Sequence, residues 1–338
     1  MYDNAGTGTE TETDDETATE AAWLTVTPAS GAAGKQTVEL AATPKITEES
    51  RTAYVDIACG KQSVRLTVTQ TGASDETNFS ALFAPEFAQK LQGLEIISDA
   101  EKITLQEMAE IAAITELDVS SSSLTSLQGI EYFESLTRLI CYVNSLTSLD
   151  VSNNSALTEL WCYSNQLTEL DLSKNTALMW LVCNNNQLGT LDVSGCSVLT
   201  TLYCDSNSLA SLDVSKNPTL TTLNCRSNSL VSLDVSNNTA LTTLMCYNNQ
   251  LTTLDVSGCS VLTTLYCDSN SLASLDVSKN TALTVLYCHG NPGDRESKFP
   301  VTAWFDSTAV PADLYIPYTS WTYEDKTIAI DYRTATAE

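Results

Sequence analysis

The sequence predicts a mainly β protein, in which a solenoid of stacked coils follows a small β-sandwich and ends in a β cap. Three observations predict this fold class. Short alternating apolar and polar runs fill residues 23–72, as in strands with one buried face. Helix-capping signals occur between residues 74 and 113. From residue 114 onward the same residue types return every 21 positions, which is typical of structural repeats stacked on one another.

Residues 1–21 are expected to be a disordered acidic leader. The segment holds seven Asp and Glu residues and no Lys or Arg, and the remainder is mainly Thr, Ala and Gly. Such a composition buries too little apolar surface to offset the entropy of ordering the chain. The segment also lacks the basic and apolar parts of a signal peptide, and no run of about twenty apolar residues follows it.

Residues 22–73 are expected to form the small β-sandwich, from the runs WLTVTP, QTVELAA, TAYVDIA and SVRLTVTQTG. The stretch WLTVTPASG, Arg51 and the closing VTQTG resemble the BACON domain, a β-sandwich of surface and secreted proteins in gut Bacteroidota. The resemblance implies either glycan binding or a spacer role, and it assigns no binding residue. The acidic leader stands where strands before Trp23 are expected, and ATPKITEES replaces the usual Asn-centred turn, so the domain resembles a truncated member.

Residues 74–113 are expected to form a helical N-terminal cap. Pro85 as a first helical residue and Gly93 as terminator bound one helix, and TLQE at residues 104–107 has the spacing of a capping box for a second. A short helical segment before stacked repeats covers the open core of the first coil. At the other end the aromatic and β-branched residues of 292–338 predict a C-terminal β cap.

Residues 114–291 carry the repeat. Each unit reads L-x-x-L-x-C-x-x-N-x-L and then L-x-x-L-D-L-x-x-N, which resembles the leucine-rich repeat in a 21-residue variant with the consensus twice per coil. The first unit has the longer, internalin-like spacing. The resemblance implies a parallel strand at L-x-C on the concave side and an extended back at L-D-V. The block 190–217 returns unchanged at 253–280, so the array has grown by copying whole coils.

Cysteines mark the strand of each unit. Alternate strand residues share a face, so Leu160 and Cys162 both point inward, where free cysteine behaves as a small hydrophobe. Core packing is the favoured interpretation. Zinc needs four converging ligands rather than a line of sulfurs, and disulfides between neighbouring strands need strained geometry. Cys196 and Cys259 stand where the other repeats have the second asparagine, at a corner of the coil. Core packing is the favoured interpretation for these two and for Cys59 as well. The strand column is Cys141, Cys162, Cys183, Cys204, Cys225, Cys246, Cys267 and Cys288.

Asparagine and aspartate recur with the same period. A buried amide supplies a donor and an acceptor to backbone groups at the turns, which explains both asparagine columns structurally. The carboxylates of the aspartate column, about 5 Å apart, repel by about 0.8 kcal/mol per pair in water. Hydroxyl or backbone donors therefore compensate them, and calcium bridging is the alternative. The aspartates are Asp150, Asp171, Asp192, Asp213, Asp234, Asp255 and Asp276.

The candidate binding residues point outward from the predicted strands. All eight aromatic residues between Glu134 and Lys298 fall in these outward columns and none on the L-D-V segments, although the aromatic preference for strands would by itself place some there. Exposed aromatic surfaces are used in protein and glycan recognition. The predicted ligand-binding residues are Tyr142, Trp161, Tyr163, Trp180, Tyr203, Asp205, Arg226, Tyr247, Tyr266, Asp268 and Tyr287.

Charge and motifs narrow the function. A net charge of −26 opposes binding to nucleic acid or to an anionic membrane. One histidine, His289, and the lack of a nucleophile, phosphate-loop or metal motif argue against an enzyme and against a cofactor. The two resemblances imply a cell-surface or exported protein, with a lipid anchor as one version of this expectation. We therefore expect a monomeric adhesion protein that binds a protein or glycan through the outward aromatic residues. The alternatives are a spacer without ligand and glycan binding through the BACON-like domain.

Overall fold

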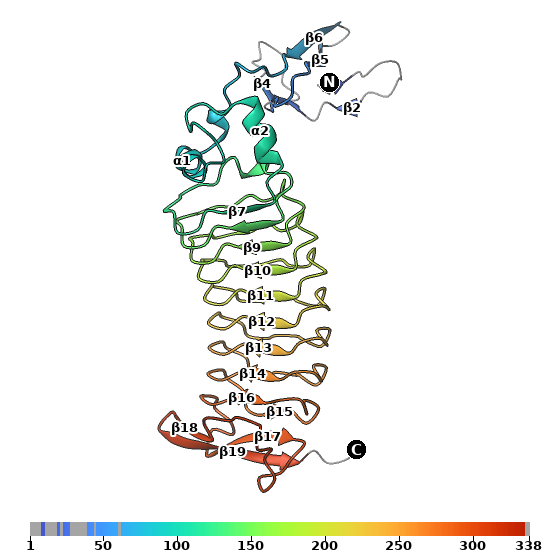
Figure 1. The fold of residues 1–338 in the computed structure, drawn as a ribbon. Helices are drawn as coiled ribbons and strands as arrows, with labels where there is room; N and C mark the ends of the chain where they lie inside the picture. The colour runs from blue at the N-terminus through green and yellow to red at the C-terminus, as the bar shows by residue number, and fades with distance from the viewer. Residues whose placement is uncertain are drawn as a thin grey trace. The chain divides into compact units, whose positions relative to one another are not determined.

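The computed structural model describes residues 8–10, 19–20, 23–27, 39–43, 45–59 and 62–334. The chain divides into two compact units. The first comprises residues 1–79 together with 101–109, and the second comprises residues 80–100 together with 110–338. The described chain is mainly β, as the sequence predicts, and its strands and helices follow in chain order (Figure 1).

The first unit contains two small antiparallel sheets. One has the strand order β2-β1-β5-β6 and the other pairs β3 with β4. Trp23, Leu24, Ala53 and Val55 are buried together, with Val26 and Val68 packed against them, so the core of this unit draws on β3, β5 and β6. The bounds are β1 Gly8–Glu10, β2 Thr19–Glu20, β3 Leu24–Thr27, β4 Glu39–Ala42, β5 Arg51–Cys59 and β6 Gln62–Gln70.

Two of these strands lie inside the segment expected to be disordered. β1 pairs antiparallel with β5, where Gly8 lies opposite Val55, and β1 also pairs with β2. The prediction of disorder is therefore wrong for these five residues, and so is the expectation that no strand precedes Trp23. Edge pairing uses backbone N–H and C=O groups, so a Thr- and Glu-rich segment can join it without burying apolar side chains. The remainder of the leader lies outside the described residues.

The predicted helices form. A 3₁₀ turn, η1, spans Ser80–Leu82, α1 spans Pro85–Gly93 and α2 spans Leu105–Ala112. The capping box is present, because the Glu107 N–H donates to Thr104 Oγ1 at 3.2 Å and the Thr104 N–H donates to Glu107 Oε2 at 2.8 Å.

Helix α1 covers the start of the repeat within the second unit. Phe87, Ala88 and Leu91 form its buried face. The Phe87 ring lies 6.1 Å from that of Phe133, next to the 3₁₀ turn η2, Ile130–Tyr132. The aromatic contact closes the apolar interior of the first coil, as the predicted N-terminal cap requires.

The repeats stack nine strands into one parallel sheet (Figure 1). Each strand holds the residue before a leucine, that leucine and the residue after it, and leucines pair in register along the ladder, as Leu160 does with Leu181. A buried cysteine follows each strand directly from β8 on, and the buried Val119 takes this place after β7. The strands are β7 Glu116–Asp118, β8 Arg138–Ile140, β9 Glu159–Trp161, β10 Trp180–Val182, β11 Thr201–Tyr203, β12 Thr222–Asn224, β13 Thr243–Met245, β14 Thr264–Tyr266 and β16 Val285–Tyr287.

From β8 on, the ladder strand belongs to the L-x-C segment and L-D-V lies outside the ladder, so the predicted assignment of the two segments is confirmed. The first coil, with its longer spacing, has an L-D-V segment at Leu117 in the ladder. After each cysteine the chain passes through a left-handed residue, such as Ser164 at φ 53°. The following asparagine holds this turn: Asn165 Nδ2 donates to the carbonyls of Cys162 at 3.1 Å and of Cys141 in the preceding coil at 3.0 Å. Gly290, at φ 69°, takes the left-handed position in the last coil.

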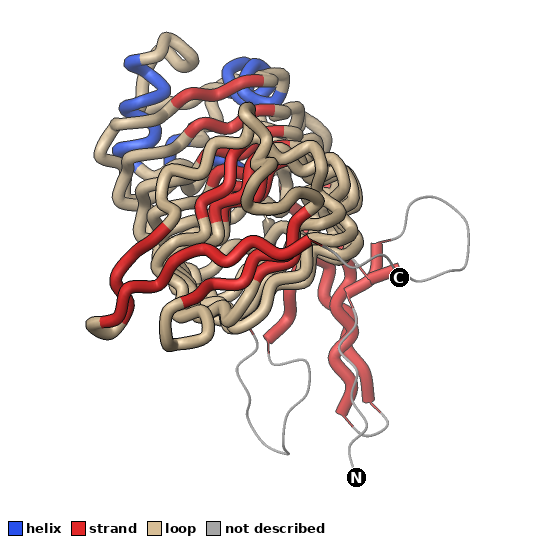
Figure 2. The backbone as a smooth tube through the Cα atoms, turned by 90° about the horizontal axis from the view of Figure 1, so that it is seen from below, coloured by secondary structure: helices blue, strands red, loops and turns tan. Residues whose placement is uncertain are grey.

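A β cap ends the solenoid. The back of the last complete coil, which contains β14, forms β15, Leu275–Asp276, which pairs in parallel with β17, Lys298–Ala303. Strand β17 pairs with β19, Lys326–Thr334, and β19 pairs with β18, Ser320–Tyr323, so these strands lie side by side (Figure 2). Phe299 and Val301 are buried, and Trp321 Nε1 donates to the Asn291 carbonyl at 2.8 Å. No described helix has the length and apolar character needed to cross a membrane.

Candidate binding face

The outward residues of the ladder form one surface, which we call the strand face. It consists of the first and third residues of strands β8 to β14 and of β16, together with the residue after each cysteine of the strand column. Leucine points inward at the middle of every strand and is fully buried, so its two neighbours point outward. This is the face that the repeat resemblance implies to be concave. All eleven predicted binding residues belong to it. Nine of them fall into three groups; the other two are Tyr203, the half-buried last residue of β11, and the buried Asp268, which follows Cys267.

The first group is aromatic and lies over β8 to β10. The Tyr142 and Tyr163 rings are stacked, with centroids 4.5 Å apart and planes inclined by 11°. The Trp161 and Trp180 rings are 6.2 Å apart. The Arg138 guanidinium lies 5.4 Å from the centre of the Trp161 ring. These contacts join residues of three neighbouring coils into one apolar patch with a cation at its edge.

Arg138 is held by two carboxylates. Its Nε lies 3.1 Å from a Glu159 oxygen, and its Nη1 lies 3.5 Å from a Glu116 oxygen. Both glutamates are partly exposed, so water screens the pairs and each contributes little to stability. Sequence reasoning left Arg138 out of the predicted site, although its position before a strand leucine places it on the strand face.

The second group is polar and lies over β11 to β13. The Asp205 side chain is only 2% exposed. Asn224 Nδ2 donates to its Oδ1 at 2.9 Å, and Arg226 Nε donates to its Oδ2 at 3.2 Å. Arg226 Nη1 also donates to the Tyr247 hydroxyl, and these hydrogen bonds, that to Tyr247 foremost, raise the pKa of Arg226. The buried Asp205 carboxylate thus holds the Arg226 guanidinium in position, and Arg226 is the more exposed of the two side chains and the one that a ligand can contact.

The third group is aromatic and extends beyond the repeat. Tyr266 and Tyr287 are stacked with centroids 4.4 Å apart. Tyr315, from the segment between β17 and β18, continues the ladder, because its N–H donates to the Thr284 carbonyl at 2.7 Å and it pairs in parallel with Val285. Its ring lies 6.2 Å from that of Tyr287.

Tyr318 completes this group. Its ring lies 4.3 Å from the imidazole of His289 and 6.4 Å from the Tyr287 ring. Tyr315 and Tyr318 are 57% and 51% exposed, so half of each side chain is open to a ligand. Sequence reasoning missed both, because they lie outside the 21-residue period; the run LYIPY in an aromatic-rich cap is the signal available.

The cysteines lie in the interior rather than in a site. All ten cysteines with a described side chain are buried and free of disulfides, which confirms core packing for these ten. Burial raises the pKa of the Cys162 thiol to about 12. The side chain of Cys59 lies outside the described residues. Within the described ranges, no three His, Cys, Asp or Glu side chains are grouped so as to hold a metal ion.

Each carboxylate of the aspartate column accepts a backbone hydrogen bond within its own turn, which compensates its negative charge. Asp171 Oδ1 accepts the Ser173 N–H at 2.8 Å, and the same contact recurs in each coil, as at Asp213 and Ser215. Hydrogen bonds from the serine of each turn lower the pKa of five of these carboxyl groups, those of Asp171, Asp192, Asp213, Asp234 and Asp255. The contact is an Asx turn, so the carboxylates serve the fold of the back.

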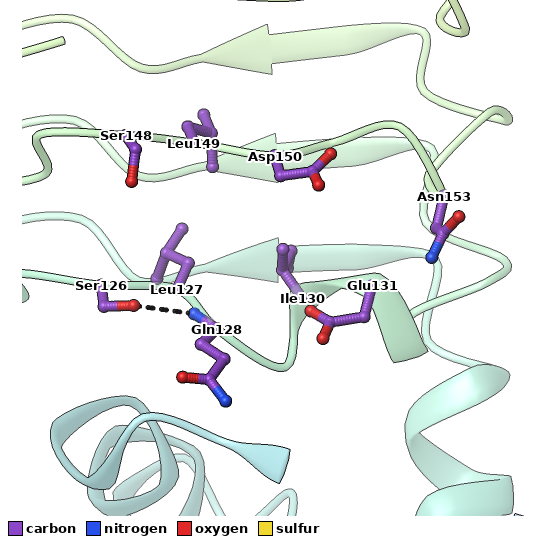
Figure 3. Close-up of a pocket in the computed structure, with 9 residues that line it drawn as sticks. All are labelled: Ser126, Leu127, Gln128, Ile130, Glu131, Ser148, Leu149, Asp150 and Asn153. Atoms are coloured by element: carbon purple, nitrogen blue, oxygen red, sulfur yellow. Dashed lines mark hydrogen bonds between the residues drawn. The ribbon is translucent and has the colours of Figure 1, made fainter. Parts of the chain in front are cut away.

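A pocket of about 350 Å³ opens on the back of the first coils (Figure 3). Its two carboxylates already accept backbone hydrogen bonds, Glu131 from the Gly129 N–H at 2.8 Å and Asp150 from the Ser152 N–H at 2.9 Å. It shares no residue with the strand face. The lining residues are Ser126, Leu127, Gln128, Ile130, Glu131, Ser148, Leu149, Asp150 and Asn153.

Known proteins match both parts of the chain. A family model described as "Viral BACON domain" matches residues 14–73. This match begins before residue 22 and includes β2, in agreement with strands ahead of Trp23. Internalin J of Listeria monocytogenes serotype 4b (strain F2365) is 39% identical over 80 residues, which are 24% of this chain and 8% of that protein. The matched segment is thus a small part of internalin J.

Solved structures share the fold of the repeat. Internalin C2 from Listeria monocytogenes strain 4b F2365 is similar over 64% of this chain and 96% of that one, with a TM-score of 0.54 and 22% identity. The leucine-rich-repeat ectodomain of a plant membrane receptor kinase from Arabidopsis thaliana, in complex with Casparian strip integrity factor 2, is similar over 65% of this chain and 27% of that one, with a TM-score of 0.50 and 21% identity. The repeat region therefore has the leucine-rich-repeat fold and is similar to internalins, and the N-terminal region is similar to the BACON domain.

Proposed function

We propose that this chain is a cell-surface or exported adhesion protein that binds a protein partner through the strand face. The observation that supports it best is the one-sided distribution of aromatic residues, which gather on the strand face and extend onto the cap through Tyr315 and Tyr318. Aromatic side chains with an apolar body and a polar tip supply much of the binding energy at protein interfaces.

A protein suits this surface better than a glycan. A sugar ring stacks on a free aromatic face, whereas each ring of the Tyr142–Tyr163 and Tyr266–Tyr287 pairs has one face covered by its partner. The Arabidopsis ectodomain, which shares the fold, is in complex with an integrity factor. A spacer without a ligand and glycan binding through the BACON-like region are the alternatives. We assign no catalytic step to the chain.

The test replaces Trp161, Tyr163 and Trp180 together by alanine and measures binding to extracellular and cell-surface protein arrays. Loss of every specific interaction, with little change in the thermal unfolding midpoint, is the expected result. The matched control replaces three exposed apolar residues outside the strand face by alanine and keeps binding; these are Val198, Val231 and Val261. Unchanged binding by the aromatic variant would exclude this part of the face, and a wild-type chain that binds nothing would favour the spacer.

A further inference from the structure

The strand face contains the same buried carboxylate twice. Asp205 and Asp268 belong to the identical blocks 190–217 and 253–280, three coils apart, and each follows a buried cysteine. Each also receives the hydroxyl of the next serine, Ser206 at 3.4 Å and Ser269 at 3.5 Å. The two sites are therefore copies of one another up to the end of the duplicated block.

The copies differ in the coil that follows. Beside Asp205 that coil supplies Asn224 and Arg226, which donate two N–H groups to the carboxylate. Beside Asp268 the same two positions hold Tyr287 and His289. His289 Nε2 lies 3.9 Å from the carboxylate, beyond hydrogen-bonding distance. In the part of the chain that the structure describes, Asp268 receives no side-chain N–H hydrogen bond.

The Asp268 site is also more open than its copy and less well compensated. The side chain of Asp268 is 11% exposed and that of Asp205 is 2% exposed. Burial raises the pKa of Asp268, which indicates a carboxylate that has lost water without gaining a strong partner. The neighbouring His289 Nδ1 is buried and has no hydrogen-bond partner among the described residues.

We propose that Asp268 and the tyrosines around it bind an arginine side chain of the protein partner, in the place that Arg226 takes beside Asp205. The first copy shows the chemistry: the Arg226 guanidinium donates to the carboxylate and to the Tyr247 hydroxyl, and its carbon lies 5.3 Å from the Tyr247 ring centre. The second copy offers the Asp268 carboxylate, with the rings of Tyr287 and Tyr318 beside His289. Guanidinium suits such a site because it pairs with carboxylate and stacks on aromatic rings.

Charge favours the same occupant. The net charge of −26 attracts a cationic segment and repels an acidic one. Burying the Asp268 carboxylate without a paired cation costs free energy in the unbound protein. A cation bound in the position that Arg226 takes beside Asp205 would offset this desolvation cost. This inference rests on the proposed binding role and adds that the partner presents an arginine at the cap end of the strand face.

His289 is the single histidine of the chain, so its imidazole NMR signals can be used to detect binding at this site. We would titrate the full-length protein in neutral solution with N-acetyl-arginine methylamide and follow the imidazole signals of His289 by proton NMR. The citrulline analogue, a neutral molecule of the same shape, is the control probe. A saturable shift with the arginine probe alone is expected. An equal shift with both probes, or no shift with either, would overturn the proposal.

Two variants locate the effect. Asp268→Asn keeps the shape of the side chain and should abolish the arginine-specific shift, whereas Asp205→Asn, the same change in the other copy, should retain it. A shift that persists in Asp268→Asn contradicts the proposal.

A second measurement compares two variants of His289. His289→Arg should raise the thermal unfolding midpoint relative to His289→Gln, because the introduced arginine supplies a guanidinium beside Asp268. The alanine variant at Trp161, Tyr163 and Trp180 should keep the His289 response, which separates this site from the test of the proposed function.

Discussion

Cys196 stands one coil after Asn175 at the same corner of the solenoid, and its thiol donates to the Asn175 carbonyl at 3.6 Å. One coil later Asn217 donates its amide to the carbonyls of Val193 at 3.0 Å and Cys196 at 2.8 Å. No described group donates to Asn217 Oδ1. This corner therefore uses a side-chain donor and no acceptor, and a thiol can replace the amide there.

The other asparagine column uses both ends of the amide. Asn207 Nδ2 donates to the carbonyls of Cys183 and Cys204 at 3.1 Å each, and its Oδ1 accepts the Leu188 N–H at 3.0 Å. We expect Asn207→Cys to cost about 1–3 kcal/mol, because a buried N–H loses its acceptor, and Asn217→Cys to cost about 1 kcal/mol or less. Urea unfolding of the two variants measures the difference, and equal losses would contradict the assignment of donor and acceptor roles.

The thiols provide a second prediction. Ten cysteines have described, buried side chains, and burial raises the pKa of Cys225 and Cys288 to about 12, so hardly any thiolate forms near pH 8. At most one of the eleven cysteines, Cys59, should react rapidly with an aromatic disulfide reagent in the native protein, and all eleven should react in denaturant. Rapid native reaction of two or more thiols would show that the cysteine column opens.

The repeat made most of the fold predictable from the sequence. From Cys141 on, a period of 21 without interruption fixes which residues stack. The outward position of Trp161 and the burial of Cys162 then follow from alternation along one strand. The helix ends at Pro85 and Gly93 follow from backbone chemistry that each residue carries alone.

Contacts made by non-repeating segments could not be predicted in the same way. Tyr315 joins the ladder through two backbone hydrogen bonds, and no periodic pattern in the sequence predicts them. The pairing of β1 with β5 likewise depends on backbone groups, and a composition argument about the acidic leader misses it. Asp205 and Asp268 have identical local sequences, so only the next coil, with Arg226 or His289, separates their environments.

Acid should weaken the back of the solenoid. Backbone and serine hydrogen bonds lower the pKa of Asp192, Asp213 and Asp234 in the folded protein below the ordinary value of 3.8. A lowered folded pKa gives stability that is present above about pH 4 and is lost as the pH falls through the folded pKa. The urea midpoint should therefore fall as the pH drops below about 4.

The control is the triple change of these three aspartates to asparagine. Asparagine Oδ1 still accepts the serine N–H, so the turn is retained, whereas the titrating charge and the repulsion between neighbouring coils are removed. The decline of the urea midpoint below about pH 4 should be shallower in this variant. A decline as steep as that of the wild type would place the acid sensitivity in other carboxylates.

Arg226→Ala should destabilise the centre of the strand face. The change leaves the Asp205 carboxylate buried, with Asn224 as its remaining side-chain N–H donor, and a buried charge that loses a partner costs about 1–3 kcal/mol. Adding Asp205→Asn to this variant should recover part of the loss, because a neutral amide needs no counter-charge. Urea unfolding of the two single variants and the double variant measures the coupling between the side chains.

Arg138→Ala is the matched control, since Arg138 also pairs with carboxylates on the strand face. Its partners Glu116 and Glu159 are exposed enough for water to solvate them once the guanidinium is removed. The expected loss is therefore about 1 kcal/mol or less. If Arg138→Ala and Arg226→Ala cost the same, burial of Asp205 is not what makes the central pair strong.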